Sequence, residues 1–277
     1  RLVYALFDKQ VVTEKESWMV AKSSRWLNEA FNSRVIVESH AKSTAVARHF
    51  AARFNEQLRA RTEKPPSVFF VPCFVYEAAK ADSLPDGEPQ CFSGERFLPG
   101  AFLKYTSNNG YVAPESPGLL HRELIQAFGH FSFVASGGRY LVADLQGVAR
   151  KAEVLLTDPQ VLSLDGPAFG PGDLRGPGVR ACLSAHRCGP TCKLLGLKPL
   201  GAAQLERLAG GGARRRHVAR PASGASLPSE WELCSEPGTG SEWEKLSEGG
   251  GVLEVALSEG VRSSQASSSS WVHLLDT

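Results

Sequence analysis

The sequence predicts an α+β fold of two lobes followed by a disordered tail. Extended apolar segments come first along the chain and helical patterns follow, an order that favours α+β architecture. Residues 1–200 alternate apolar runs with turn signals, whereas residues 201–277 are rich in Gly and Ser. A segment of that composition buries too little apolar surface to offset the entropy lost on ordering it. We therefore predict one folded domain over 1–200, with lobes of about 1–95 and 96–200, and a disordered tail over 201–277.

The composition excludes several classes of protein. With 277 residues, of which 42% are hydrophobic and 22% charged, the chain is long enough to bury a sizeable core. No apolar run reaches the roughly 20 residues that a membrane-spanning helix needs. Lys and Arg number 31 against 29 Asp and Glu, so the net charge of +2 provides no field that attracts nucleic acid or acidic lipid. We expect no membrane partner, no specific nucleic acid and a cytoplasmic location.

The first lobe is expected to combine a few strands with one long helix. Leu2–Phe7 is an apolar run without a small-residue cleavage site behind it, which indicates a strand rather than a signal peptide. Large apolar residues recur every four positions from Val46 to Leu58, as on the buried face of a helix. The predicted elements are strands at 2–7 and 18–21, a helix at 41–59, a buried strand at 68–76 and a polar loop at 81–94.

The second lobe is expected to contain short strands and helices separated by loops. Glycine and proline crowd residues 157–178, which indicates a loop. Val179, Leu183 and His186 then share one face of a helix. The other predicted elements are an extended segment at 97–105, a short helix at 121–130 followed by the apolar run 131–134, and a strand at 140–143 that ends at Asp144.

His186, Cys188 and Cys192 form an H-x-C-x3-C pattern that favours a zinc site. A helix end would deliver the imidazole, and the loop that follows can fold both thiolates around one ion. Zinc prefers sulfur and imidazole ligands in four-coordinate geometry, and a site with four protein ligands is structural. The candidates for the fourth ligand are His121, His130 and Cys182. The alternative is that these are buried cysteines and a histidine that caps the helix.

Asp144, Gln146 and Asp158 form a candidate phosphoryl-transfer site. Asp144 and Gln146 follow a predicted strand and lie two residues apart, so extended backbone would direct both into one cleft. Asp158 lies in a Thr-Asp-Pro turn further along the chain. Two carboxylates and an amide could hold Mg²⁺ and orient a hydroxyl nucleophile. The alternative is ordinary turn chemistry, since Asp is common where strands end and Asp-Pro begins turns.

Lys22 ends the predicted strand at 18–21, a position from which an ammonium group can reach phosphates. The alternative is a solvated lysine at a strand end. Gly170-Pro171-Gly172 is a candidate anion or peptide loop, but no Gly-Lys-Ser/Thr follows it, so it is not a Walker loop. The sequence contains neither His-Arg-Asp nor Asp-Phe-Gly, which excludes a conventional protein kinase.

A series of short motifs runs in a fixed order along residues 1–200. The stretches are Val20–Lys22, Gly94–Gly100, Lys104–Gly110, Ala127–Phe133, Val142–Val148, Leu156–Gln160, Phe169–Gly172 and the H-x-C-x3-C pattern. Together they resemble the alpha-kinase family of atypical Ser/Thr protein kinases, and within it the elongation factor 2 and myosin heavy chain kinase groups. The resemblance implies a two-lobed alpha-kinase fold with a structural zinc site in the C-terminal lobe.

The resemblance also implies a role for each matching residue. Lys22 would hold the ATP phosphates, and the backbone of Glu95 and Phe97 would meet the adenine in the hinge between the lobes. Asp144 would be the catalytic residue beside the substrate hydroxyl, acting with Lys22. The remaining implied residues are Gln146 and Asp158 for Mg²⁺, Lys104 and Asn108 lining the same cleft, and His130 as the zinc ligand that joins His186, Cys188 and Cys192.

The implied function is transfer of the γ-phosphoryl group of Mg-ATP to a Ser or Thr hydroxyl of a protein, such as a translation factor or a myosin-like protein. The implied cofactors are ATP, Mg²⁺ and structural Zn²⁺. The alternative is a catalytically inactive, zinc-stabilised pseudokinase that serves as a binding module. The sequence begins at Arg1, past the place of the family's Gly-rich loop, which favours that alternative. The joint presence of the catalytic and magnesium residues favours an active kinase.

Two positions depart from the family pattern. Arg175 stands where the family has a glycine, which would alter the docking of a peptide substrate. A glutamate partner for Lys22 is not evident, because Val46 occupies the position in the predicted helix where one is sought.

The tail contains a repeated motif. Ser229-Glu230-Trp231-Glu232 returns as Ser241-Glu242-Trp243-Glu244. An exposed Trp with acidic neighbours could add to a partner's sheet edge or groove, so the tail is a candidate carrier of short interaction motifs. The alternative is low-complexity drift.

Overall fold

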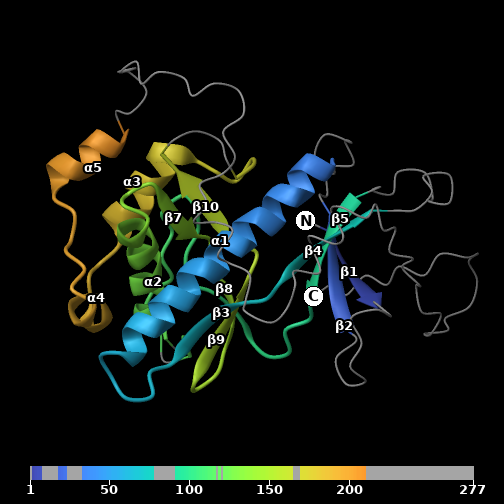
Figure 1. Cartoon of the computed structure of the whole chain (residues 1–277), viewed down its shortest axis with the longest axis horizontal. Helices are drawn as coiled ribbons and strands as arrows, with labels where there is room; N and C mark the ends of the chain where they lie inside the picture. Colours follow the sequence, from blue (N-terminus) through green and yellow to red (C-terminus); the bar gives the residue numbers. More distant parts are fainter. Residues whose placement is uncertain are drawn as a thin grey trace, which may run out of the picture.

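Helix α1 runs between two groups of strands and helices in the computed structural model (Figure 1). The structure describes residues 2–7, 18–23, 33–77, 91–116, 118–119, 121–164 and 169–209. The elements are β1 (Leu2–Phe7), β2 (Trp18–Ser23), α1 (Arg34–Arg59), β3 (Ser67–Phe70), β4 (Cys73–Glu77), β5 (Cys91–Arg96), β6 (Phe102–Lys104), α2 (Arg122–Ala135), β7 (Tyr140–Ala143), β8 (Gln146–Ala149), β9 (Glu153–Thr157), β10 (Gln160–Ser163), α3 (Arg175–Ala185), α4 (Pro190–Leu194) and α5 (Ala202–Ala209). The predicted α+β class is confirmed.

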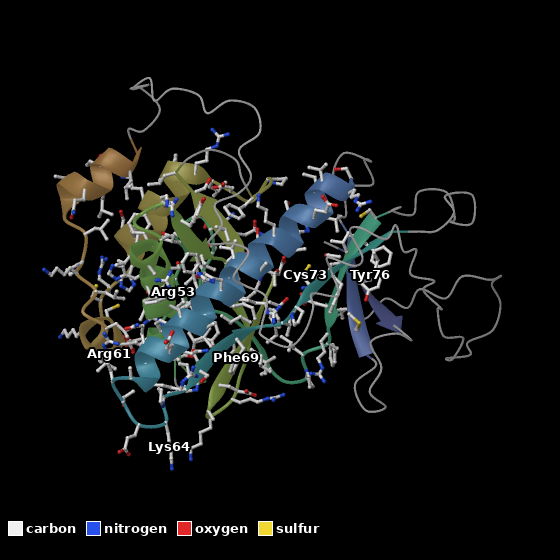
Figure 2. The ribbon with its side chains drawn as sticks, in the orientation of Figure 1. Arg53, Arg61, Lys64, Phe69, Cys73 and Tyr76 are labelled. Atoms are coloured by element: carbon white, nitrogen blue, oxygen red, sulfur yellow. The ribbon has the colours of Figure 1, made fainter. Side chains whose placement is uncertain are left out.

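The first lobe is an antiparallel sheet in the order β1-β2-β5-β4. Tyr76 stacks on Phe92 with 5.3 Å between ring centroids, and its hydroxyl donates to Met19 Sδ at 3.6 Å. Figure 2 shows Tyr76 on this sheet, far from Lys64 in the turn that follows α1. The polar loop was expected at 81–94, but its last residues, 91–94, belong to β5 because they pair with both β2 and β4.

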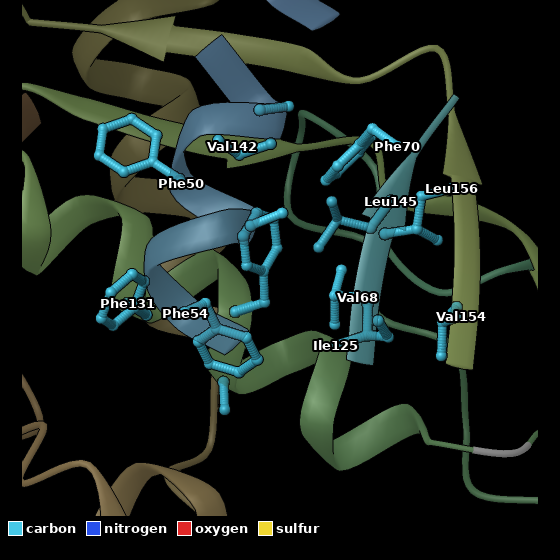
Figure 3. Packing of buried hydrophobic residues seen from close by; sticks show 14 of the residues in the cluster. Phe50, Phe54, Val68, Phe70, Ile125, Phe131, Val142, Leu145, Val154 and Leu156 are labelled. Atoms are coloured by element: carbon cyan, nitrogen blue, oxygen red, sulfur yellow. The ribbon is translucent and has the colours of Figure 1, made fainter. Parts of the chain in front are cut away.

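Helix α1 buries one face in the main hydrophobic core. The predicted four-residue period is confirmed, since Phe50, Phe54 and Leu58 are 3%, 0% and 2% exposed. These side chains pack with residues of β3, α2 and β9, as Figure 3 shows. The helix begins at Arg34 rather than at residue 41, and its additional first turns bury Val37.

The second lobe contains a four-stranded sheet in the order β3-β9-β8-β6 and the two-stranded pair β10-β7. The buried strand expected at 68–76 is wrong as a single element. Its first half, β3, pairs in parallel with β9, and its second half, β4, pairs with β5 in the other sheet. Pro72 lies at the break, where its lack of an N–H group interrupts a ladder.

Three further expectations are corrected. The loop expected at 157–178 contains β10 and the start of α3, because Val161 and Leu162 pair with β7 and are fully buried. Helix α2 extends through the run at 131–134. Helix α5 lies inside the expected tail, where Leu205 and Leu208 pack against the apolar cluster of α3.

The remaining part of the expected tail, 210–277, lies outside the described residues, and so do its Trp motifs. Among the helices that the structure describes, none combines the length and hydrophobicity that a bilayer crossing requires.

Candidate active site and metal cluster

Asp144 and Asp158 lie where the chain passes from one sheet to the next. Ala143 of β7 pairs with Gln160 of β10, and Gln146 of β8 pairs with Thr157 of β9. The β7–β10 and β8–β9 pairs follow one continuous register, which is interrupted between them by two residues on each chain segment. The two-residue links that begin at Asp144 and Asp158 therefore lie opposite each other. A hairpin separates the two residues in the sequence, and the strand pairing places their backbone links side by side.

Backbone conformation explains the interruption of the ladder. Asp144 has φ 56° and Asp158 has φ 53°, both in the left-handed region. This conformation costs a residue with a side chain roughly 1–2 kcal/mol, and Asp is among those that tolerate it best. Val142 and Leu145 hold the first turn in place, since they are 0% and 1% exposed in the core.

A polar row crosses the sheet beside Asp144. Lys104 of β6 pairs with Gln146, and Gln146 pairs with Thr157, so these three side chains share one face of the sheet. Lys104 Nζ lies 2.9 Å from Asp144 Oδ1. Gly147 follows Gln146 with φ 155°, and a Cβ there would lie 2.0 Å from the Leu155 carbonyl oxygen, so the close approach of the strands requires glycine.

Lys22 points into the same region and is held by two side chains. Its Nζ lies 2.5 Å from Glu95 Oε1 and donates to Thr157 Oγ1 at 3.2 Å. The Thr157 hydroxyl donates to Glu95 Oε2. The Lys22 side chain is 13% exposed, so the alternative of a solvated strand-end lysine is wrong.

Glu95 is the carboxylate partner of Lys22 that the sequence pattern does not reveal. Lys22 pairs with Ser93 across β2 and β5, which places Glu95 two residues further along the same face. Only the register of two strands that lie far apart in the sequence provides this signal.

The other predicted cleft residues lie around this centre. Phe97 follows β5 at the connection to the second lobe and is 48% exposed. Asn108 Nδ2 donates to the Gly172 carbonyl oxygen at 3.0 Å and so fixes the Gly-Pro-Gly loop. A Cβ at Gly172 would lie 1.5 Å from Gln160 Oε1, so a larger residue there would displace the end of the Gln160 side chain. The assigned roles of these residues stay predictions.

Four side chains form a separate cluster in the second lobe. The ligand atoms of His130, His186, Cys188 and Cys192 all lie within 4.8 Å of one another. His130 Nδ1 lies 3.6 Å from Cys188 Sγ and 3.7 Å from Cys192 Sγ, and His186 Nε2 lies 3.4 Å from Cys192 Sγ. Tetrahedral zinc, with bonds of about 2.3 Å to sulfur and 2.0–2.1 Å to nitrogen, would separate such atoms by about 3.6 Å. The geometry and the donor set therefore fit zinc.

Burial shifts the pKa values of two cluster residues, His186 and Cys192, in favour of their neutral forms. Burial lowers the pKa of His186 to about 4, with help from His130 and Arg187, so the imidazole is neutral and can act as a ligand. Burial raises the pKa of Cys192 to about 12, so the isolated thiol would keep its proton. A bound metal ion removes that penalty because it stabilises the thiolate directly.

The structure distinguishes the three candidates for the fourth ligand. His130 of α2 joins the cluster. His121 Nε2 instead lies 2.8 Å from the Arg150 carbonyl oxygen, and the Cys182 thiol donates to the Ser107 carbonyl oxygen at 3.4 Å. The sequence pattern could not identify the fourth ligand, because His130 lies 56 residues before His186 in the chain.

Glu123 supports the cluster from α2. Its carboxylate accepts hydrogen bonds from the Thr191 backbone N–H at 2.9 Å and from the Thr191 hydroxyl at 2.6 Å. The first contact satisfies one free N–H group at the start of α4, the helix that carries Cys192. The sequence analysis missed this residue, for which only the tertiary contact provides a signal.

The cluster is connected through α2 to β7, the strand that leads to Asp144. Helix α2, which carries His130, packs on β7, and the Val142 N–H donates to Ser132 Oγ at 2.9 Å. A cavity of about 30 Å³ between the two regions is lined by residues of both, including His186, Ala143 and Leu145. The position of the Asp144 turn therefore depends on the packing that the cluster holds together.

Comparison with known proteins identifies the family. Residues 1–192 match the model of the Alpha-kinase family, and the chain therefore belongs to the alpha-kinase family. It is 35% identical over 161 residues to myosin heavy chain kinase C of Dictyostelium discoideum, covering 58% of this chain and 18% of that protein. It is 36% identical over 121 residues to human eukaryotic elongation factor 2 kinase, covering 44% of this chain and 15% of that protein.

Solved structures agree with this assignment. The alpha-kinase domain of myosin-II heavy chain kinase A in complex with AMP-PNP has a TM-score of 0.55 and 30% identity, covering 66% of this chain and 65% of that chain. The predicted alpha-kinase fold is confirmed. The chain covers only 18% and 15% of the lengths of the two curated relatives described above, which are larger proteins.

Proposed function

We propose that this chain transfers the γ-phosphoryl group of Mg-ATP to a Ser or Thr hydroxyl of a protein. Membership of a family of protein kinases supports the reaction class. The observation that carries the active, rather than inactive, assignment is the arrangement around Lys22. Its amine is shielded from bulk solvent and held by Glu95. The amine also contacts Thr157, which pairs with Gln146 in the second-lobe sheet and directly precedes Asp158.

Each residue has a distinct part in the proposed mechanism. Lys22 binds the phosphates, and Gln146 and Asp158 would hold Mg²⁺, which supplies charge neutralisation. Asp144 orients the acceptor hydroxyl and receives its proton as that oxygen bonds to the γ-phosphorus, while the bond from the γ-phosphorus to the bridging oxygen breaks and ADP leaves. Lys104 holds the Asp144 carboxylate in position at 2.9 Å. Positioning and electrostatic stabilisation provide most of the catalysis in this chemistry.

The proposal also includes residues that would contact the adenine and the acceptor peptide. The backbone of Glu95 and Phe97 would meet the adenine at the connection between the lobes. Asn108 and the loop it fixes at Gly172 would lie near the acceptor peptide. The names of the relatives suggest myosin-like proteins or a translation factor as substrates, in a cytoplasmic setting. The cluster of His130, His186, Cys188 and Cys192 is proposed to hold a structural Zn²⁺.

Substitution of the two central residues tests the assignment. We expect Asp144→Ala and Lys22→Ala to abolish incorporation of labelled phosphate into a generic acceptor such as myelin basic protein. Circular dichroism should show both variants folded, and Glu63→Ala, an exposed carboxylate in the turn after α1, should retain full activity. Normal phosphate incorporation by either variant would refute the assignment.

A binding measurement beside the activity assay would identify the inactive, pseudokinase alternative. A wild-type chain that binds Mg-nucleotide in a calorimetric titration but incorporates no phosphate would be a pseudokinase that serves as a binding module.

A further inference from the structure

Thr157 joins the two lobes through its hydroxyl group. It is the last residue of β9, in the sheet of the second lobe, and it is 3% exposed. Its hydroxyl accepts from Lys22 Nζ at 3.2 Å and donates to Glu95 Oε2. Lys22 and Glu95 belong to β2 and β5 of the first lobe, 135 and 62 residues away in sequence.

The chemistry of the contact requires a hydroxyl. A threonine oxygen can accept a hydrogen bond from an ammonium group and donate one to a carboxylate at the same time. Valine has nearly the same shape and can do neither. The Lys22 and Glu95 side chains are 13% and 8% exposed, so water replaces a lost partner poorly.

The position of Thr157 gives this contact a functional consequence. Thr157 immediately precedes Asp158 and pairs with Gln146 across the sheet. One hydroxyl therefore connects the proposed metal ligands of the second lobe with the proposed phosphate ligand of the first. We propose that Thr157 is a positioning residue, which holds the Glu95 carboxylate against the Lys22 amine and sets where that amine meets the phosphates. This inference rests on the proposed kinase function.

Loss of the Thr157 hydroxyl should weaken the binding of the nucleotide's phosphate groups and leave the binding of its nucleoside part unchanged. Adenosine has no phosphate and would not meet the Lys22 amine, whereas AMP-PNP carries three phosphate groups. Solved alpha-kinase domains similar to this chain include complexes with each of these molecules. A general disturbance of the lobes would weaken both ligands, but displacement of the Lys22 amine would weaken only AMP-PNP.

Calorimetric titrations of the full chain with Mg-AMP-PNP and with adenosine provide the test. We expect Thr157→Val to weaken Mg-AMP-PNP binding by about 10- to 150-fold, the range that corresponds to the loss of a hydrogen bond to a charged group, and to change adenosine binding by less than about twofold. Thr157→Ser keeps the hydroxyl and should bind Mg-AMP-PNP within about threefold of the wild type.

Thr44→Val is the matched control. Thr44 is also buried, and its hydroxyl donates to the His40 carbonyl oxygen within α1 at 3.0 Å. This variant loses a buried threonine hydroxyl away from the candidate site and should bind both ligands as the wild type does. If Thr157→Val does not fold, Glu95→Gln must show the same selective loss, because a neutral amide no longer holds the amine.

The possible outcomes separate this inference from the proposed function. Equal weakening of both ligands by Thr157→Val, or unchanged binding of Mg-AMP-PNP, overturns the positioning role. Unchanged binding by Glu95→Gln overturns it as well. A wild-type chain that binds neither ligand overturns the proposed function and this inference together.

Discussion

Arg175 occupies a backbone conformation that suits glycine. It has φ 53° at the start of α3, and its N–H donates to Asp173 Oδ1 at 3.0 Å. The same carboxylate group accepts from the Ser163 N–H at 2.8 Å and the Ser163 hydroxyl at 2.6 Å, so the turn is fixed by buried hydrogen bonds. The turn therefore forces Arg175 into the left-handed region, which explains why the family pattern has glycine at this position.

Arg175→Gly should stabilise the protein. The substitution removes roughly 1–2 kcal/mol of backbone strain and adds roughly 0.5–1 kcal/mol of unfolded-state entropy, so we expect a net gain of up to about 1 kcal/mol. Urea denaturation measures the free energy of unfolding. Arg175→Ala is the control, because it removes the same charge from the helix start but keeps the side-chain strain. An Arg175→Gly variant no more stable than Arg175→Ala would contradict the argument.

At the scale of elements, a single amide fastens α1 to the second-lobe sheet. Asn55 Nδ2 donates to the Val68 carbonyl oxygen at 2.8 Å, and the Val68 N–H donates to Asn55 Oδ1 at 2.9 Å. Asn55 is 3% exposed and Val68 is fully buried. The side chain thus satisfies both backbone groups of an edge strand whose other side pairs with β9.

We expect Asn55→Ala to destabilise the fold by about 2–4 kcal/mol. Two buried backbone groups would lose their partners, and each costs roughly 1–3 kcal/mol when it is left unsatisfied. Thermal or urea unfolding measures the loss. Glu56→Ala, at the exposed neighbouring position of the same helix, should change the free energy of unfolding by less than about 0.5 kcal/mol. Comparable stabilities for the two variants would show that the amide does not fasten α1.

Helix α5 packs on α3, although the Gly/Ser-rich composition around it predicted disorder. Arg180 Nη2 lies 2.6 Å from Glu206 Oε1, and Leu205 and Leu208 cover the apolar cluster that contains Val179. The amphipathic pattern of eight residues is too short to predict a stable helix on its own. Tertiary burial stabilises it.

Two truncations separate the contribution of α5 from that of the residues after it. A chain ending at residue 209 should unfold at the same temperature as the full chain, whereas a chain ending at residue 200 should unfold at a lower one. Loss of two half-buried leucines corresponds to about 2–4 kcal/mol, which lowers the melting temperature by roughly 5–15 °C. Equal melting temperatures for the two truncations would show that α5 adds no stability.

At the scale of the whole molecule, α2 and β7 connect the candidate metal cluster with the candidate active site. Helix α2 carries His130 and packs on β7, which ends at Asp144. His186 directly follows α3, which ends at Ala185, and its imidazole lies beside that of His130 at 4.8 Å between ring centroids. We therefore expect disruption of the cluster to disturb the Asp144 turn through this packing.

Metal removal should disturb catalysis through the fold. We expect about one zinc ion per chain by elemental analysis, and we expect its removal with 1,10-phenanthroline to lower the melting temperature by about 10 °C or more and to reduce phosphorylation in parallel. Cys188→Ser should reproduce both effects. Cys73→Ser, in β4 and outside the cluster, should retain the metal and the activity. A metal-free chain with unchanged melting temperature would contradict a structural role.

Short-range patterns were sufficient to predict α1 and several strands. The face of α1 from Val46 to Leu58 and the strands β1, β2 and β7 follow from the order of apolar residues. Their ends were less predictable, because the first turns of α1 and the last turn of α2 depend on what they pack against. The strand at 68–76 was wrongly predicted as one element, since an apolar run does not indicate which sheet pairs with each half.

The amino-acid order alone was enough to identify the motifs, the H-x-C-x3-C pattern and the family, because each is a local arrangement of residue types. The assembly of the site required the folded chain. Glu95 is 73 residues from Lys22, and His130 is 58 residues from Cys188. Contacts of that separation depend on strand register and helix packing, which are cooperative properties of the fold and leave no periodic signal in the chain.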